Sequence, residues 1–315
     1  MFKKIFLYIF FSSLSLNAVS AQDDGISVDL KKYENRALGE DFTAQPCADM
    51  ERSLVHVKGN LYRHTADKLP SLHSGFVLIT KEGALVIDPA FTCTSSWLNN
   101  EIKSKFNVKV KYVIYTHAHA DHISGGQIFE KDGAIIIANQ RALEPIVGEK
   151  IPTALPSRVF DKNMTIELGG EKVNLHRIAA SHSNSMILAY FPDYKAIQCT
   201  DVCQSKTMPY NDFLDFYYDG WIETLDWVIS QDVDIIDVGH YSFAQKEDII
   251  AERRYMIDLH QQVLNLVREG KSWDELYRKV EFSDEVKGWF GFESMKTLNV
   301  MGMYRWVSNH RRGIW

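Results

Sequence analysis

Short apolar runs alternate with amphipathic segments through the first part of the chain. Runs rich in β-branched residues and bounded by Gly or Pro predict strands, at residues 74–80, 83–89, 108–116 and 133–139. Apolar residues at helical spacing predict helices between them, at 95–106 and 142–149. Residues 22–50 are polar and irregular and indicate an N-terminal arm.

The second part of the chain changes from strands to helices. Apolar runs with tight turns predict consecutive antiparallel strands, at 165–170, 172–179, 185–191 and 196–201. The segment 221–230 is an amphipathic helix, and 234–240 is the final strand. Helical spacing then continues, in 246–270, 271–280 and 294–311. Strand–helix alternation together with antiparallel runs favours an α+β sandwich with helices outside the sheets.

The first 21 residues have the features of a secretory signal peptide. Lys3 and Lys4 precede an apolar stretch from Ile5, and small residues lead to a cleavage site near Ala21. The alternative is a membrane anchor, but the apolar stretch is short and contains Ser and Asn. The sequence therefore predicts a periplasmic or secreted protein without a stable membrane anchor.

Composition limits the partners. Of 315 residues, 45% are hydrophobic, which is enough for a sizeable core, and the formal net charge is −6. Removal of two lysines with the signal peptide makes the charge −8. An acidic chain is poorly suited to holding nucleic-acid phosphates, so a small-molecule substrate is expected.

Export makes the four cysteines candidates for disulfides. Cys199 and Cys203 would lie about 13 Å apart on one extended strand, which is too far for a bridge between them. Cys47–Cys93 is then the favoured pair. Buried thiols remain the alternative for each of the four.

The segment THAHADHISGG, residues 116–126, concentrates metal-binding side chains. His117 and His119 are two apart at a strand end and therefore point to the same side, while Asp121 and His122 follow at a turn. Imidazole and carboxylate are zinc ligands. Gly125 and Gly126 allow the backbone to pass close to its neighbours.

Three further candidates each follow a predicted strand. They are His182, Asp201 and His240. A single histidine is more often a hydrogen-bonded loop or core residue. Their common position at the carboxyl ends of strands favours a shared site with the first cluster.

Over residues about 55–245 the sequence resembles the metallo-β-lactamase-fold hydrolases. The similarity lies in HxHxDH at residues 117–122, AASHSNS around His182, CTDVC around Asp201 and DVGHYS around His240. Residues 86–90, VIDPA, match the early strand of that family, which ends in Asp. The resemblance implies an αββα sandwich with a dinuclear metal site at one edge of the two sheets.

The resemblance also implies the ligand assignment. His117, His119 and His182 would bind the first metal, Asp121, His122 and His240 the second, and Asp201 both. The expected cofactor is two Zn²⁺, with Mn²⁺ or Fe²⁺ as alternatives. A single Zn²⁺ already lowers the pKa of bound water from about 15.7 to about 7, so a bridging hydroxide would serve as nucleophile at neutral pH. Asp121 is the candidate catalytic residue that orients this hydroxide.

Other positions have weaker signals. Asp88 would accept a hydrogen bond from a metal-bound imidazole, or would cap a loop. Aromatic residues of 210–221 would line an acyl pocket, or would pack against the C-terminal helices. The candidates for the pocket are Tyr210, Phe213 and Tyr218, with His73 at its rim.

The choice of hydrolase depends on Asp201. An Asp at the bridging position is similar to the glyoxalase II, lactonase and phosphodiesterase branches, whereas dizinc β-lactamases have Cys or no bridging side chain. We therefore expect cleavage of an ester, lactone or related acyl bond, with β-lactam hydrolysis as the alternative. A non-haem iron redox enzyme similar to persulfide dioxygenases is the alternative of another class.

The expected organisation has four parts. They are a signal peptide at 1–21, an arm at 22–50, a catalytic domain at 51–245 and a helical extension at 246–315 packed on the same domain. Ordinary core packing is the default role of the extension; the alternatives are that it covers the site or forms a homodimer interface.

Overall fold

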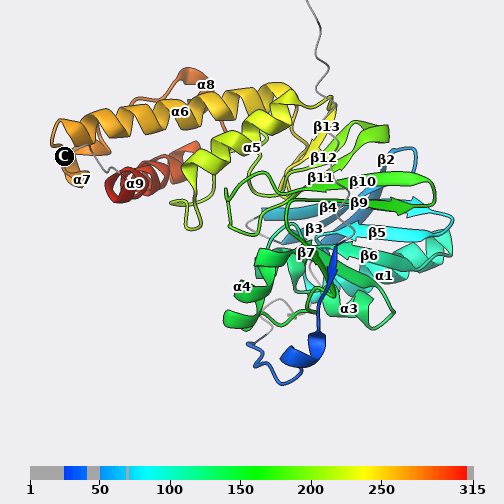
Figure 1. Cartoon of the computed structure of the whole chain (residues 1–315). Coiled ribbons are helices and arrows are strands. Elements are labelled where there is room, and N and C mark those ends of the chain that lie inside the picture. Colours follow the sequence, from blue (N-terminus) through cyan, green and yellow to red (C-terminus); the bar gives the residue numbers. More distant parts are fainter. Residues whose placement is uncertain (1–24, 41–49, 69–70, 311–315) are drawn as a thin grey trace, which may run out of the picture.

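The computed structural model describes residues 25–40, 50–68 and 71–310. Two sheets lie against each other with helices on both outer sides (Figure 1). The larger sheet has the strand order β1-β8-β7-β6-β5-β4-β3-β2, and the smaller sheet has the order β13-β12-β11-β10-β9.

The larger sheet combines antiparallel and parallel pairs. Its strands are β1 (Ile26–Ser27), β2 (Glu51–Lys58), β3 (Leu61–Lys68), β4 (Ser71–Thr80), β5 (Gly83–Ile87), β6 (Val110–Ile114), β7 (Ile135–Asn139) and β8 (Arg158–Phe160). The pairs from β5 to β8 are parallel, so the carboxyl ends of these strands meet at one edge. Loops that carry functional side chains typically follow such ends.

The smaller sheet is an antiparallel meander with one parallel addition. Its strands are β9 (Asn163–Leu168), β10 (Glu171–His176), β11 (Leu188–Phe191), β12 (Ala196–Gln198) and β13 (Ile235–Asp237). The successive antiparallel pairs of β9 to β12 confirm the consecutive strands that the sequence predicts. Strand β13 returns parallel to β12 after the crossover through helix α5.

The helices form the two outer layers. The larger sheet and its loops carry α1 (Thr92–Phe106), α2 (Ala120–Ile123), α3 (Gly126–Glu130) and α4 (Leu143–Gly148). The later helices are α5 (Tyr218–Ser230), α6 (Lys246–Arg268), α7 (Trp273–Leu276), α8 (Asp284–Lys287) and α9 (Phe292–His310). Short 3-10 turns occur at η1 (Leu30–Tyr33), η2 (Gln140–Ala142) and η3 (Pro192–Tyr194).

Apolar residues fill three layers between these elements. Strand β4 illustrates the arrangement. Its Phe76 and Leu78 face the smaller sheet, while Val77 and Ile79 face the outer helix layer that contains α1. A central strand that is covered on both sides needs apolar side chains on both of its faces. A further core joins the smaller sheet to α5, α6 and α9. The result is the α+β sandwich that the sequence predicts.

Differences from the expected elements occur mainly at the edges. Strands β2 and β3 and the short strand β8 were not predicted, because their apolar patterns are interrupted by charged residues. The N-terminal arm is not wholly irregular, since β1 pairs with β8. Arg36 donates to the carbonyl of Ile151 at 3.0 Å and so ties the arm to the loop after α4.

The predicted signal peptide and its cleavage site near Ala21 lie outside the described residues, as does Cys47. In the part of the chain that the structure describes, no helix has the length and apolar character needed to cross a membrane.

Candidate metal centre

The HxHxDH segment occupies the loop after β6 and the first turn of α2. His117 and His119 lie in this loop, and Asp121 and His122 lie in α2. The following Gly pair is required by close packing. A Cβ at Gly125 would come within 1.7 Å of Ser95 Oγ, and one at Gly126 within 1.7 Å of the Tyr115 hydroxyl. The expectation of a close backbone approach is therefore confirmed.

The three downstream candidates reach the same place from the smaller sheet. His182 lies between β10 and β11, Asp201 follows β12, and His240 follows β13. Asp201 has a φ of +63°, in the left-handed region that non-glycine residues seldom adopt. This local bend turns the carboxylate toward the histidines of the other sheet.

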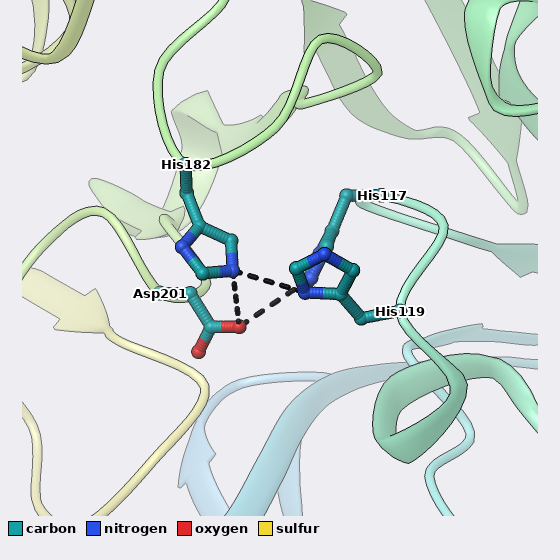
Figure 2. A group of neighbouring side chains, drawn as sticks. All are labelled: His117, His119, His182 and Asp201. Atoms are coloured by element: carbon teal, nitrogen blue, oxygen red, sulfur yellow. Dashed lines mark hydrogen bonds and ion pairs between the residues drawn. The ribbon is translucent and has the colours of Figure 1, made fainter. Parts of the chain in front are cut away.

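One group of donor atoms is formed by His117, His119, His182 and Asp201 (Figure 2). Asp201 Oδ2 lies 3.4 Å from both His117 Nε2 and His182 Nε2. His182 Nε2 lies 3.0 Å from His119 Nδ1. Four donor atoms from three loops therefore face a common centre.

A second group shares Asp201. His122 Nε2 is 3.0 Å from Asp201 Oδ2 and 3.4 Å from Asp121 Oδ2. His240 Nε2 is 3.0 Å from Asp201 Oδ1 and 3.9 Å from Asp121 Oδ2. The structure thus brings together all seven residues that the sequence suggested as ligands, with Asp201 between the two groups.

Burial of the site is uneven. The side chains of His117 and His122 are at most 1% exposed, whereas those of His119 and Asp121 are 29% and 38% exposed. The floor is therefore inside the protein, and the side formed by His119 and Asp121 is open to a substrate.

The charges of the site are strongly coupled. Burial raises the pKa of Asp201, but the electrostatic and hydrogen-bond contacts of its carboxylate with His122 and His240 outweigh burial and hold the pKa well below its usual range. Burial lowers the pKa of His122, but Asp201 and Asp121 outweigh it and raise the pKa to about 10. Burial lowers the pKa of His182 to about 4. A metal ion would replace the proton on His122 as the compensating positive charge.

Asp88 acts on the site through a threonine. Its Oδ1 accepts from the Thr116 backbone N–H at 2.8 Å, and its Oδ2 accepts from the hydroxyls of Thr116 at 2.7 Å and Thr200 at 2.9 Å. The Thr116 hydroxyl oxygen lies 3.0 Å from His117 Nδ1 and can accept its proton. Burial raises the pKa of Asp88 to about 6, although these hydrogen bonds lower it. Asp88 thus anchors the loop and also orients His117.

Sequence reasoning missed Asp215. Its Oδ2 lies 2.8 Å from His119 Nε2, so it fixes this imidazole with Nδ1 facing the first group. The hydrogen bond opposes desolvation and raises the pKa of His119. Asp215 lies 96 positions from His119 in an aromatic loop, and no local pattern links the two.

Glu252 of α6 was also missed. It is fully buried and accepts from Trp221 Nε1 at 3.0 Å and from the Gln204 backbone N–H at 2.8 Å. The Gln204 side chain in turn donates to the carbonyl of Asp201 at 3.3 Å. The C-terminal helices are therefore connected to the loop of the shared carboxylate.

The predicted pocket residues lie in different places. Tyr210 is 68% exposed, whereas Phe213 is buried and stacks on Phe216. Tyr218 stacks on His260 of α6, with 4.2 Å between ring centroids. Phe213 and Tyr218 therefore take the packing role that the sequence left open. His73 is buried beside Asp121.

A cavity of about 430 Å³ adjoins the open side of the site. His119, Ala120 and Asp121 form one wall. The other walls come from Gly39 and Glu40 of the arm and from residues 149–152. The Gly39 backbone N–H donates to the carbonyl of Lys150 at 2.7 Å and joins these two walls. In the described part of the chain the arm, rather than the aromatic loop, borders this cavity.

The cysteines near the site differ from expectation. Strand β12 ends at Gln198, and the Cys203 backbone N–H donates to the carbonyl of Cys199 at 3.4 Å. The assumption of one extended strand was therefore wrong, because the chain turns at Asp201. Both thiols are free and buried, whereas Cys93 is disulfide-bonded.

The donor set fits metal ions. His117 Nε2 and His122 Nε2 are buried and make no hydrogen bond of good geometry within the described residues, although Asp201 Oδ2 lies 3.4 Å and 3.0 Å from them. Two ligands about 2.1 Å from one tetrahedral ion lie about 3.4 Å apart, which agrees with the distances among the donor atoms. Imidazole and carboxylate donors suit Zn²⁺, and also Fe²⁺ or Mn²⁺.

Comparisons with known proteins identify the family. The family model of the metallo-beta-lactamase superfamily matches residues 70–240. A type 2 metallo-beta-lactamase of Bacillus cereus is 25% identical over 206 residues, covering 60% of this chain and 76% of that protein. A metal-dependent hydrolase of Mesorhizobium japonicum is 30% identical over 116 residues, covering 36% of this chain and 46% of that protein.

The fold comparison gives the same result. A metallo-beta-lactamase structure from Pontibacter korlensis aligns with a TM-score of 0.59 at 16% identity, covering 65% of this chain and 99% of that one. On the fold, the paired donor groups and the family match, the chain belongs to the metallo-beta-lactamase superfamily of metal-dependent hydrolases.

Proposed function

We propose that the protein is an exported dizinc hydrolase that cleaves an ester, lactone or related acyl bond. The observation that carries the proposal is the position of Asp201. Its Oδ2 faces His117, His182 and His122, and its Oδ1 faces His240. A carboxylate shared in this way suits a pair of ions better than one ion.

Each side chain has a defined part in this proposal. His117, His119 and His182 would hold the first ion, and Asp121, His122 and His240 the second, with Asp201 shared between them. When bound, the two ions would supply an activated water at neutral pH and would polarise the substrate carbonyl.

The remaining groups keep the ligands in position. Asp88 orients His117 through Thr116, and Asp215 orients His119 directly. Asp121 lies on the open side, where its carboxylate can hold a proton of the attacking water. The described part of the site therefore needs no Ser or Cys nucleophile.

The cavity supports a small substrate with both polar and apolar parts. Its volume of about 430 Å³ lies in the range of small-molecule sites. Glu40, Glu149 and Lys150 contribute charges of both signs, and Ile151 and Pro152 an apolar surface. These walls do not favour a strongly anionic substrate such as a polyphosphate.

A β-lactamase is the second candidate function. Relatives named metallo-beta-lactamases match over most of the domain, and a periplasmic location would bring the protein into contact with β-lactams. Against this, Asp201 occupies the bridging position. Cys199, two residues before Asp201, is buried in the core that the smaller sheet shares with the C-terminal helices.

A substrate panel with metal analysis tests the proposal. A lactone, an aryl ester, a thioester, a phosphotriester and nitrocefin are each assayed with zinc-loaded protein. Turnover is expected for the lactone or an ester. Nitrocefin turnover far above all others would replace the proposal by the β-lactamase function. Bound iron with oxygen consumption would replace it by a redox function.

A further inference from the structure

His73 lies among the donor atoms of the second group. It is part of β4 and is only 6% exposed. Its Nε2 is 3.2 Å from Asp121 Oδ2. This is closer than His122 Nε2, at 3.4 Å, or His240 Nε2, at 3.9 Å, lies to the same oxygen. Three imidazole nitrogens therefore face one carboxylate oxygen.

Backbone pairing between the two sheets fixes this position. His73 and His240 face each other in an antiparallel bridge. On one side the Ser74 backbone N–H donates to the carbonyl of Gly239 at 2.8 Å. On the other, His240 Nδ1 lies 3.1 Å from the carbonyl of Leu72 and must donate its proton there. His240 Nε2 consequently carries the lone pair that a metal ligand needs.

Ring packing prevents His73 from turning away. Its imidazole meets the rings of Phe91 and His240 edge to face, with 4.6 Å and 4.5 Å between centroids. Its Nδ1 is buried without a hydrogen-bond partner in the described part of the chain. The contact that the structure gives the ring nitrogens is therefore the one toward Asp121.

The spacing of these atoms is that of ligands around one ion. The donor atoms of His73, Asp121 and His240 lie within 4.8 Å of one another. With its proton on Nδ1, His73 would offer an Nε2 lone pair to an ion between these residues.

We propose that His73 is a further ligand of the second metal, together with Asp121, His122, Asp201 and His240. Five protein donors and one solvent position make six, which exceeds the four ligands usual for zinc. The second position would therefore hold zinc only with expanded coordination, and it would also accept an ion that takes six ligands, such as Mn²⁺ or Fe²⁺. This inference rests on the two-metal site of the proposed function.

Metal titration of matched variants tests the role. His73→Ala, His73→Gln and the control His56→Ala, an exposed histidine of β2, are titrated with Co²⁺ after chelation. Binding of each equivalent is followed by calorimetry and by visible absorption. We expect both His73 variants to lose at least about tenfold in affinity for the second equivalent, with the first equivalent unchanged. We also expect a stronger absorption band, because lower-coordinate Co²⁺ absorbs more strongly.

The glutamine variant separates the two possible roles of His73. A Gln amide can donate to Asp121 as a histidine would, but it is a poor metal ligand. Normal second-site affinity in His73→Gln with loss in His73→Ala would overturn the ligand role in favour of an orienting hydrogen bond. Normal affinity in both variants would overturn any role at this site.

A wild-type measurement guards against a folding defect. A structure of the metal-loaded protein is expected to show His73 Nε2 bonded to the second ion, and an Nε2 directed elsewhere would refute the inference. A wild type that binds one equivalent would refute the two-metal proposal itself. Two equivalents in wild type with unchanged His73 variants would refute only the inference about His73.

Discussion

Replacing Glu252 by Gln should change the pH dependence of stability. Glu252 is fully buried, and burial raises its pKa to about 8 from an ordinary value of 4.5, although hydrogen bonds from Trp221 and Gln204 lower it. Between these two pH values the folded protein keeps the carboxyl protonated while the unfolded chain ionises. Stability from this group is therefore fully present below pH 4.5 and is lost as the pH rises to about 8.

The magnitude follows from the two pKa values. Each pH unit in this window costs about 1.4 kcal/mol, so the whole window costs about 5 kcal/mol. From pH 6 to pH 8, wild type should lose about 2 kcal/mol through this group, because the carboxyl is already half ionised at pH 8. Glu252→Gln lacks this titration. It adds a constant loss of about 1–3 kcal/mol, because both partners are N–H donors and the amide N–H₂ of Gln cannot accept from the second.

The assay is urea unfolding of wild type and Glu252→Gln at pH 6 and pH 8, with a chelator present so that metal binding does not contribute. The other ionisable groups are common to both proteins and cancel in the difference. The unfolding free energy of wild type minus that of Glu252→Gln should decrease by about 2 kcal/mol as the pH rises. An unchanged gap would show that Glu252 is ionised in the folded protein, and the argument from burial would then be wrong.

Three further predictions concern the metal ligands and their supports. Asp201→Ala should bind fewer ions by elemental analysis, because both donor groups lose an oxygen; two retained ions with normal turnover would disprove the sharing. Asp215→Ala should weaken binding of the first equivalent by about tenfold in calorimetry, because it removes the acceptor for His119 Nε2–H; an unchanged affinity would show that the contact is incidental. Zinc affinity should rise with pH from 6 to 9, because the pKa of His122 is raised to about 10 and its proton must leave before it can bind zinc; a pH-independent affinity would mean that His122 is neutral in the metal-free protein.

The fold was largely predictable because the central strands have uninterrupted apolar runs. Residues 83–87 are wholly buried, and a continuous apolar run between turn residues identifies such a strand. Strands β2 and β3 contain charged residues. Strand β2 is the edge strand of the larger sheet and stays partly exposed, and β3 lies next to it. Their apolar pattern is too weak to identify from one sequence.

The grouping of the candidate metal ligands was predictable because they follow strands whose ends meet at one edge. His117 and His119 are close in sequence, and His182, Asp201 and His240 each stand near a strand end. Supporting contacts such as Asp215–His119 and Glu252–Gln204 join distant loops and depend on tertiary packing. The turn at Asp201 was missed because the predicted strand 196–201 was extended to include Asp201, whose backbone is left-handed.

The contact of His73 with Asp121 could not be predicted from the sequence for a related reason. Its neighbours in sequence place it at the start of a strand, near a pocket rim. Its position beside Asp121 depends on the bridge to His240, which joins the two sheets. A contact between sheets leaves no periodic signal in the sequence.

The central claim is that two ions held around Asp201 perform the hydrolysis. Chelated protein is titrated with Zn²⁺, and turnover of the best substrate of the panel is measured at each equivalent. We expect no turnover in the metal-free protein and a rise that continues through the second equivalent. Full turnover without metal would contradict the account, and saturation at one equivalent would contradict the need for the second ion.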